Sequence, residues 1–149
     1  RDPLWSRGLG DVYKRQTLTA LNAFRFTDAL NREPALDRAV DFLLEHWLIK
    51  KPIGPCHYGI GTLFMQVEYP FRDYNLFQYV YVLSFYNRAK KDKRFLEALA
   101  ALQAKLVNAE VVIERVVPKL AKLSFCQKGK PSELATMRYQ EILANLDNN

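Results

Sequence analysis

The stretch that decides the fold is PIGPCHYGIGTLFMQVEYPFRDYNLFQYVYVLSFY, residues 52–86. Glycine and proline recur through its first part, which predicts an irregular loop over about Pro52–Asp73. Its last part, 76–86, is apolar or aromatic at nearly every position and leaves no wide polar face. A helix that is apolar all round is enclosed by other elements. We therefore predict a buried helix over about Tyr74–Ala89.

Helical patterns lie on both sides of this stretch. Upstream, apolar residues at helical spacing predict a helix over about Thr17–Leu30, a very short turn at Asn31 and a second helix over about 33–51. Downstream, the pattern predicts an amphipathic helix over Asp92–Val107, with its first residue as the N-cap. The second helix of each pair has a polar face. Enclosed and surface helices are therefore predicted to alternate, with Tyr74–Ala89 more buried than Asp92–Val107.

The C-terminal part of the chain begins with a short β-branched segment. NAEVVIERVV, residues 108–117, predicts a strand-like connector that ends at Pro118, and 119–125 is ambiguous. Ser132 is then expected to cap a last helix over about Glu133–Leu146. The pattern as a whole indicates an all-α fold.

Length and composition narrow the class of protein. The 149 residues suffice for one domain with a real core, and no apolar run is long enough for a membrane span. The net charge is +6, but the basic residues are scattered along the sequence, so a nucleic-acid partner is not expected. Cys56 and Cys126 provide no disulfide framework. No cofactor is expected.

The first sixteen residues, RDPLWSRGLGDVYKRQ, have neither a helical nor a strand period. They resemble an adapter-derived translation artefact of metagenomic sequences, and a mobile natural tail is the alternative. Either reading excludes 1–16 from the fold and leaves 17–149 as the structured domain. The artefact reading adds that the natural N-terminus is missing; a cytoplasmic location is the expectation.

Three motifs carry a resemblance to a known family: YPFRDYNLFQYVYVLSFY at 69–86, KDKRFLEALAALQAK at 91–105 and GKPSELATMRYQEIL at 129–143. Together with the helix alternation, they resemble the bacterial prenyltransferase/squalene-cyclase-like α/α toroid repeats. The resemblance implies that 17–149 is the C-terminal part of a toroid domain. Its partners would be N-terminal repeats of the same chain and an apolar or isoprenoid-like molecule in a central aromatic cavity.

The chain also departs from this family. The D-x-D-D acid motif and the Q-W repeats of the cyclases are absent, and the prenyltransferase zinc ligands have no counterpart at matching spacing. Cys56 and His57 are adjacent, and neighbouring residues rarely both face one ion, so no metal is expected. If the protein is an enzyme, the resemblance implies a transferase or a cyclase/isomerase that acts on an isoprenoid-like substrate.

Two groups of residues are candidates for a site. His57 with Glu68 or Asp73 forms a candidate acid–base set, although the same residues can simply brace the loop through hydrogen bonds. Aromatic faces can line an apolar cavity and stabilise a carbocation, although plain core packing is the more common role in an enclosed helix. The candidate ligand-binding residues are Tyr58, Tyr69, Tyr74, Phe77, Gln78 and Tyr81.

Two functions follow from these patterns. One is a toroid domain that holds an apolar ligand; the other is a non-catalytic helical scaffold or interaction module of the same fold. The helix Thr17–Leu30 carries more apolar surface than one short hairpin covers, which predicts an exposed apolar patch and self-association. A compact domain formed by 17–149 that closes on itself is the alternative.

Overall fold

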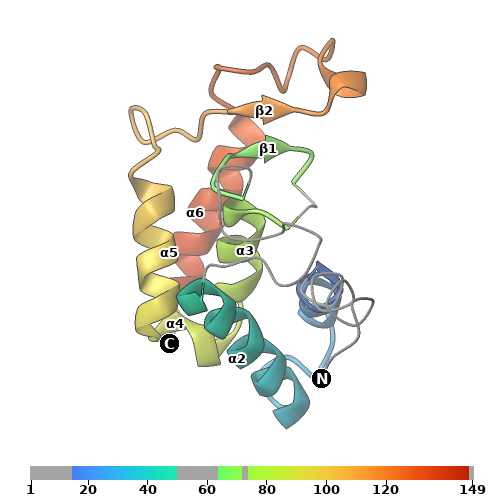
Figure 1. Ribbon diagram of the computed structural model, residues 1–149, viewed down its shortest axis with the longest axis vertical. Coiled ribbons are helices and arrows are strands. Elements are labelled where there is room, and N and C mark those ends of the chain that lie inside the picture. The colour runs from blue at the N-terminus through green and yellow to red at the C-terminus, as the bar shows by residue number, and fades with distance from the viewer. Residues whose placement is uncertain (1–14, 50–63, 72–73, 148–149) are drawn as a thin grey trace.

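The computed structural model describes residues 15–49, 64–71 and 74–147. Helix α3 (Leu76–Leu83) lies in the middle of the molecule, with the other long helices around it (Figure 1). All eight of its residues are buried. The side chain of Asn75 caps its start by accepting a hydrogen bond from the Gln78 N–H, at 3.0 Å. The prediction of an enclosed helix is confirmed.

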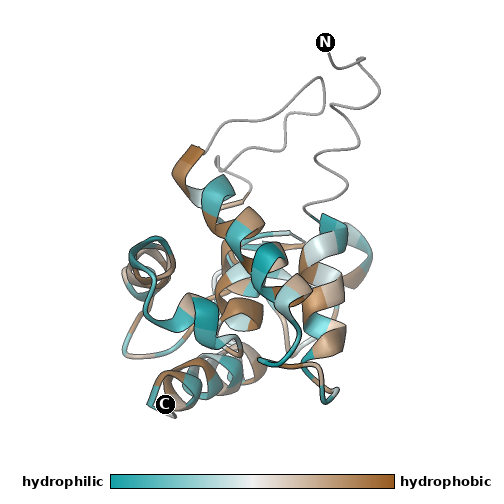
Figure 2. Ribbon diagram, turned by 90° about the horizontal axis from the view of Figure 1, so that it is seen from below, coloured by the Kyte–Doolittle hydropathy of each residue, from teal (hydrophilic) through white to brown (hydrophobic). Residues whose placement is uncertain are grey.

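The surrounding elements are mostly helical, which confirms the all-α class. They are a helix over 15–24, α2 (Pro34–Ile49), α4 (Asn87–Lys90), α5 (Lys93–Gln103) and α6 (Glu133–Asp147), with a 3₁₀ turn at Pro118–Leu120. Helix α3 packs against α5 and α6, and α2 packs against α4 and α5. Figure 2 shows hydrophilic and hydrophobic residues alternating along the surrounding helices, as expected of amphipathic helices. No helix in the described ranges is both long and apolar enough to cross a bilayer.

Helix α5 tests the predicted difference in burial. Only Phe95, Ala98, Leu99 and Leu102 of its 11 residues are buried, so α3 is the more buried helix, as predicted. Asp92 is its N-cap and accepts a hydrogen bond from the Arg94 N–H at 2.8 Å, which confirms the predicted cap. The helix ends at Gln103, four residues before the predicted Val107.

The first helix also ends earlier than predicted. It stops at residue 24 rather than at Leu30, because 25–32 form successive turns in which Thr27 bonds the Phe24 carbonyl through both its N–H and its hydroxyl. Asn31 then adopts a left-handed conformation, φ 60°, consistent with its predicted role as a terminator. Residues 15 and 16, assigned above to the tail, are helical.

The predicted helix Tyr74–Ala89 is divided in two. The Ser84 hydroxyl donates to the Tyr81 carbonyl at 2.6 Å, and Tyr86 is extended before α4 begins. The side chain of Asn31 forms hydrogen bonds on both sides of this break. Its amide nitrogen donates to the Phe85 carbonyl, and its amide oxygen accepts from the Asn87 N–H. A side chain 54 residues away in sequence thus satisfies backbone groups that the interrupted helix leaves open.

A small parallel strand pair stands at one end of the helices. Strand β1 (Glu68–Tyr69) pairs with β2 (Arg115–Val116), so the predicted strand-like segment 108–117 is confirmed only at these two residues. The left-handed Asn108 and Ala109 form a turn between the bridged Val107 and Glu110, and Val112 forms an isolated antiparallel bridge with Pro131. Helix α6 starts as predicted, with the Ser132 hydroxyl accepting from the Ala135 N–H at 3.2 Å.

Two buried tyrosine hydroxyls join the central helices to their neighbours. Tyr79 donates to the Leu43 carbonyl of α2 at 2.8 Å, and Tyr86 donates to the Leu21 carbonyl of the first helix at 2.5 Å. Burial raises the pKa of both phenols, that of Tyr86 to about 12. The deprotonated phenolate is therefore disfavoured in the folded state.

These tyrosines predict alkaline unfolding. Because the folded pKa of Tyr86 lies above the unfolded value near 10, its contribution is complete below pH 10 and is lost as the pH rises towards about 12. Tyrosinate absorbance and circular dichroism, recorded against pH, should show that at least these two phenols ionise together with unfolding. Tyr86→Phe should remove one of them. Ordinary titration of every tyrosine near pH 10 in the folded protein would contradict the burial described here.

Candidate functional site

The structure describes six of the nine predicted site residues. His57, Tyr58 and Asp73, together with Cys56, lie outside the described residues. The six belong to β1 and to α3, apart from Tyr74, which lies two residues before α3. Tyr69 and Phe77 share the neighbour Phe71, whereas Tyr74 contacts His46 and Glu68 contacts Arg115.

Glu68 is held by the strand pair. Its carboxylate forms an ion pair at 3.1 Å with Arg115, which is its partner in the register of β1 and β2. Beside it, the ring of Tyr69 meets Phe71 and Phe125 edge-on, with centroids 5.3 and 5.8 Å apart. These contacts hold the strand pair to its surroundings.

Tyr74 contacts a histidine that the sequence reasoning did not single out. The Tyr74 Oη and the His46 Nδ1 are 2.5 Å apart, and the two rings stack with centroids at 5.6 Å. His46 is only 2% exposed. It lies three residues after Leu43 on the buried side of α2, so its helical spacing could have identified it. A buried imidazole hydrogen-bonded to a phenol has acid–base capacity, although it also serves as a core contact.

Phe77 and Tyr81 pack into the middle of the molecule. Phe77 is fully buried, and its ring centroid lies 5.0 Å from that of Phe71. Tyr81 is 5% exposed, and its hydroxyl donates to the Glu141 carboxylate of α6 at 2.8 Å. Burial, and then this hydrogen bond, raise the pKa of Tyr81. Both rings are therefore packed as core residues.

Two arginines flank Tyr81. The guanidinium carbons of Arg25 and Arg138 lie 5.4 and 5.2 Å from the centre of its ring, within the range of a cation–π contact. Arg25 also lies over Phe85, at 4.5 Å. Within the described residues, neither guanidinium forms an ion pair with a carboxylate. Besides facing these rings, Arg25 donates to the Asn22 amide oxygen at 2.8 Å and Arg138 donates to the Phe71 carbonyl at 3.4 Å.

Gln78 and Asn75 carry buried polar atoms without a hydrogen-bond partner. The Gln78 Oε1 and the Asn75 Nδ2 are both shielded from solvent and unbonded, in residues that are 4% and 3% exposed. Gln78 lies three residues before Tyr81 and so shares its side of α3. An unbonded buried acceptor costs free energy, and such groups are uncommon in native proteins.

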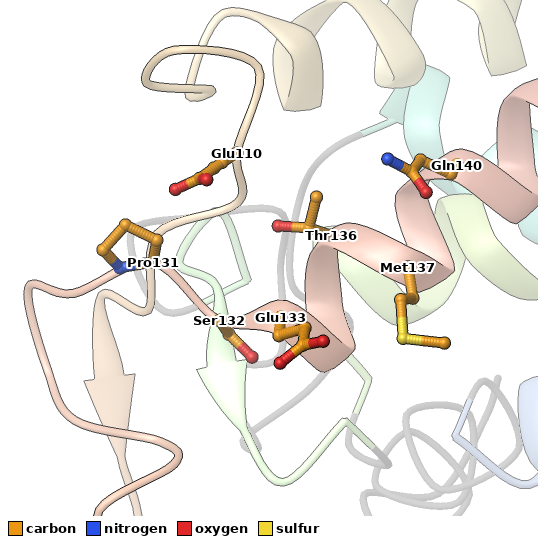
Figure 3. Close-up of a pocket in the computed structure, with 7 residues that line it drawn as sticks. All are labelled: Glu110, Pro131, Ser132, Glu133, Thr136, Met137 and Gln140. Atoms are coloured by element: carbon orange, nitrogen blue, oxygen red, sulfur yellow. The ribbon is translucent and has the colours of Figure 1, made fainter.

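A surface pocket of about 500 Å³ lies elsewhere, at the start of α6 (Figure 3). The Thr136 hydroxyl in its wall accepts a hydrogen bond from the Val111 N–H at 3.1 Å. None of the predicted site residues lines it. The lining residues are Glu110, Pro131, Ser132, Glu133, Thr136, Met137 and Gln140.

Among residues 15–49, 64–71 and 74–147, no three histidine, cysteine or acidic side chains are grouped closely enough to hold an ion. Cys126 is a buried free thiol. Its sulfur contacts the carbonyls of Leu120 and Leu123, at 3.8 and 3.9 Å.

No protein-family model, curated protein or solved structure matches the chain. The fold is therefore assigned from the structure alone, as a mostly helical domain.

Proposed function

We propose that the chain is a non-catalytic helical interaction module of the α/α toroid kind, which docks against a further helical unit. The observation that supports this proposal is the close packing of the aromatic residues of α3. Phe77 and Tyr81 are 0% and 5% exposed and pack on Phe71, on the two arginines and on α6. Side chains packed in this way stabilise the domain and leave little surface for a substrate.

The arrangement of the helices is compatible with toroid repeats. In such repeats each helical hairpin buries its apolar face against the next hairpin. Here the enclosed α3 packs on the amphipathic α5, and α5 packs in turn on the amphipathic α2. This alternation of enclosed and surface helices is the feature on which the toroid proposal rests.

The docking surface we propose is the end of the first helix. Leu18 and Leu21 of this helix are buried, but Phe24 and Phe26 are 43% and 75% exposed. Two large aromatic side chains this close in sequence form an apolar surface suited to another helix. The apolar patch predicted for the helix Thr17–Leu30 would therefore consist of Phe24 and Phe26.

The experiment is light scattering over a range of concentrations. The protein is expected to self-associate, and the double variant Phe24→Ser/Phe26→Ser should shift it to monomer and lower the binding of an apolar dye. Leu96→Ser, which changes a 44% exposed residue of α5, is the matched control and should leave association unchanged. A concentration-independent monomer without dye binding would remove the support for this surface.

A second function, the binding of an apolar ligand with a polar group, is favoured by one observation. The unbonded Gln78 Oε1 lies one helical turn from Tyr81, which Arg25 and Arg138 flank. A ligand that entered here would satisfy the buried amide and meet aromatic surface. Titration with a C15 isoprenoid alcohol, followed by NMR shifts of α3, tests it. Shifts that persist in Gln78→Met would argue against this site.

A further inference from the structure

The segment 118–130, PKLAKLSFCQKGK, is here called the basic loop. It contains four lysines and no acidic residue, so it accounts for +4 of the net charge of +6. Figure 1 shows it projecting beyond β2 at one end of the molecule. Although basic residues are scattered along the whole sequence, the four lysines of the basic loop therefore lie together at one end of the molecule. The four lysines, all exposed, are Lys119, Lys122, Lys128 and Lys130.

Backbone hydrogen bonds fix both ends of the basic loop to the body of the protein. On the way out, the Val117 N–H donates to the Tyr69 carbonyl at 3.1 Å. On the way back, the Gly129 N–H donates to the Ile113 carbonyl at 2.7 Å, and the Ile113 N–H donates to the Lys130 carbonyl at 3.1 Å. Cys126, only 1% exposed, anchors the interior. The loop therefore has a defined shape, as compact surface loops with close ends do.

Apolar side chains are exposed among these lysines. Phe125 is 59% and Leu123 37% exposed, although neither position is required to be apolar by a helix or a strand. None of the four lysines forms an ion pair with a described carboxylate. Exposed apolar groups surrounded by uncompensated positive charge are what a lipid surface with anionic headgroups attracts.

We propose that the basic loop binds the surface of an anionic phospholipid bilayer. Leu123 and Phe125 would insert at the level of the headgroups, while the lysines contact the lipid phosphates and carboxylates. A nucleic acid would attract the same lysines. However, the loop has no arginine, and of its two exposed apolar side chains only Phe125 offers a base-stacking face whereas Leu123 is aliphatic, so the observations favour the bilayer.

The test is co-sedimentation of the full chain with vesicles of phosphatidylcholine containing about 30 mol% phosphatidylserine, with pure phosphatidylcholine as the comparison. We expect partition into the anionic vesicles alone, weakened by salt. Lys122→Gln/Lys128→Gln should lower the partition coefficient by about 25-fold, because each lysine contributes about fivefold. Phe125→Ser should lower it by about tenfold or more, and Phe125→Leu should retain most of it.

Matched changes outside the loop serve as controls. Lys93→Gln and Leu96→Ser alter an exposed lysine and an exposed leucine of α5 and should leave the partition coefficient unchanged. Circular dichroism of each variant separates loss of binding from loss of folding. The proposal is overturned if the protein does not bind anionic vesicles, or if it binds neutral vesicles equally well. It is also overturned if the protein binds duplex DNA more tightly than lipid, and if that binding depends on the lysines but not on Phe125.

Discussion

Replacing Phe77 by alanine is expected to lower the free energy of unfolding by about 3–5 kcal/mol. Phe77 is fully buried in α3, where its ring lies against Phe71, and the surrounding helices leave it no solvent contact. Removing the ring forfeits its burial and leaves a cavity that rigid neighbours fill only in part. Urea unfolding followed by circular dichroism measures the change.

The control for this variant is Leu96→Ala on α5. Leu96 is 44% exposed, so its truncation should change the free energy of unfolding by no more than about 0.5 kcal/mol. A loss below about 1 kcal/mol for Phe77→Ala would mean that the ring faces an open cavity rather than packed neighbours. The ligand-cavity function would then replace the interaction module.

Gln78→Met is expected to act in the opposite direction and raise the free energy of unfolding by about 1–3 kcal/mol. The Gln78 Oε1 is buried without a hydrogen-bond partner, and methionine fills a similar volume without burying a polar atom. Thermal and urea unfolding both report the gain. Gln140→Met, an exposed position of α6, is the matched control and should change little.

A loss of stability in Gln78→Met would contradict this account, because it would reveal a partner for the amide oxygen. A gain in stability combined with the loss of isoprenoid-alcohol shifts would instead favour the second function. Polar groups kept in a core at a cost to stability are typical of functional sites. The Gln78→Met variant thus distinguishes the interaction module from the domain that binds an apolar ligand.

Much of the fold follows from local patterns in the sequence. The absence of a polar face predicted the burial of α3, and Asp92 and Ser132 were recognised as caps because their side chains act on adjacent backbone. The break after Leu83 was missed, because it depends on Asn31, a residue distant in sequence. Local propensity carries no information about such a contact.

The site was harder to predict for the same reason. Tyr74, Gln78 and Tyr81 recur at helical spacing in the predicted helix Tyr74–Ala89, so they would share one side of it and were candidates for one cavity. In the structure Tyr74 meets His46 and Tyr81 meets Arg25 and α6, because each is covered by a different element. A helical ridge predicts which residues share a side, but the neighbouring elements decide what covers each of them.

Hydrogen–deuterium exchange tests most directly the claim that α3 is the packed core of the domain. The account predicts that the amides of Tyr79 to Leu83 exchange only through global unfolding, more slowly than those of α5, whose outer face is in water. Exchange in α3 that is faster than in α5, in otherwise folded protein, would contradict the account and point to an open interior.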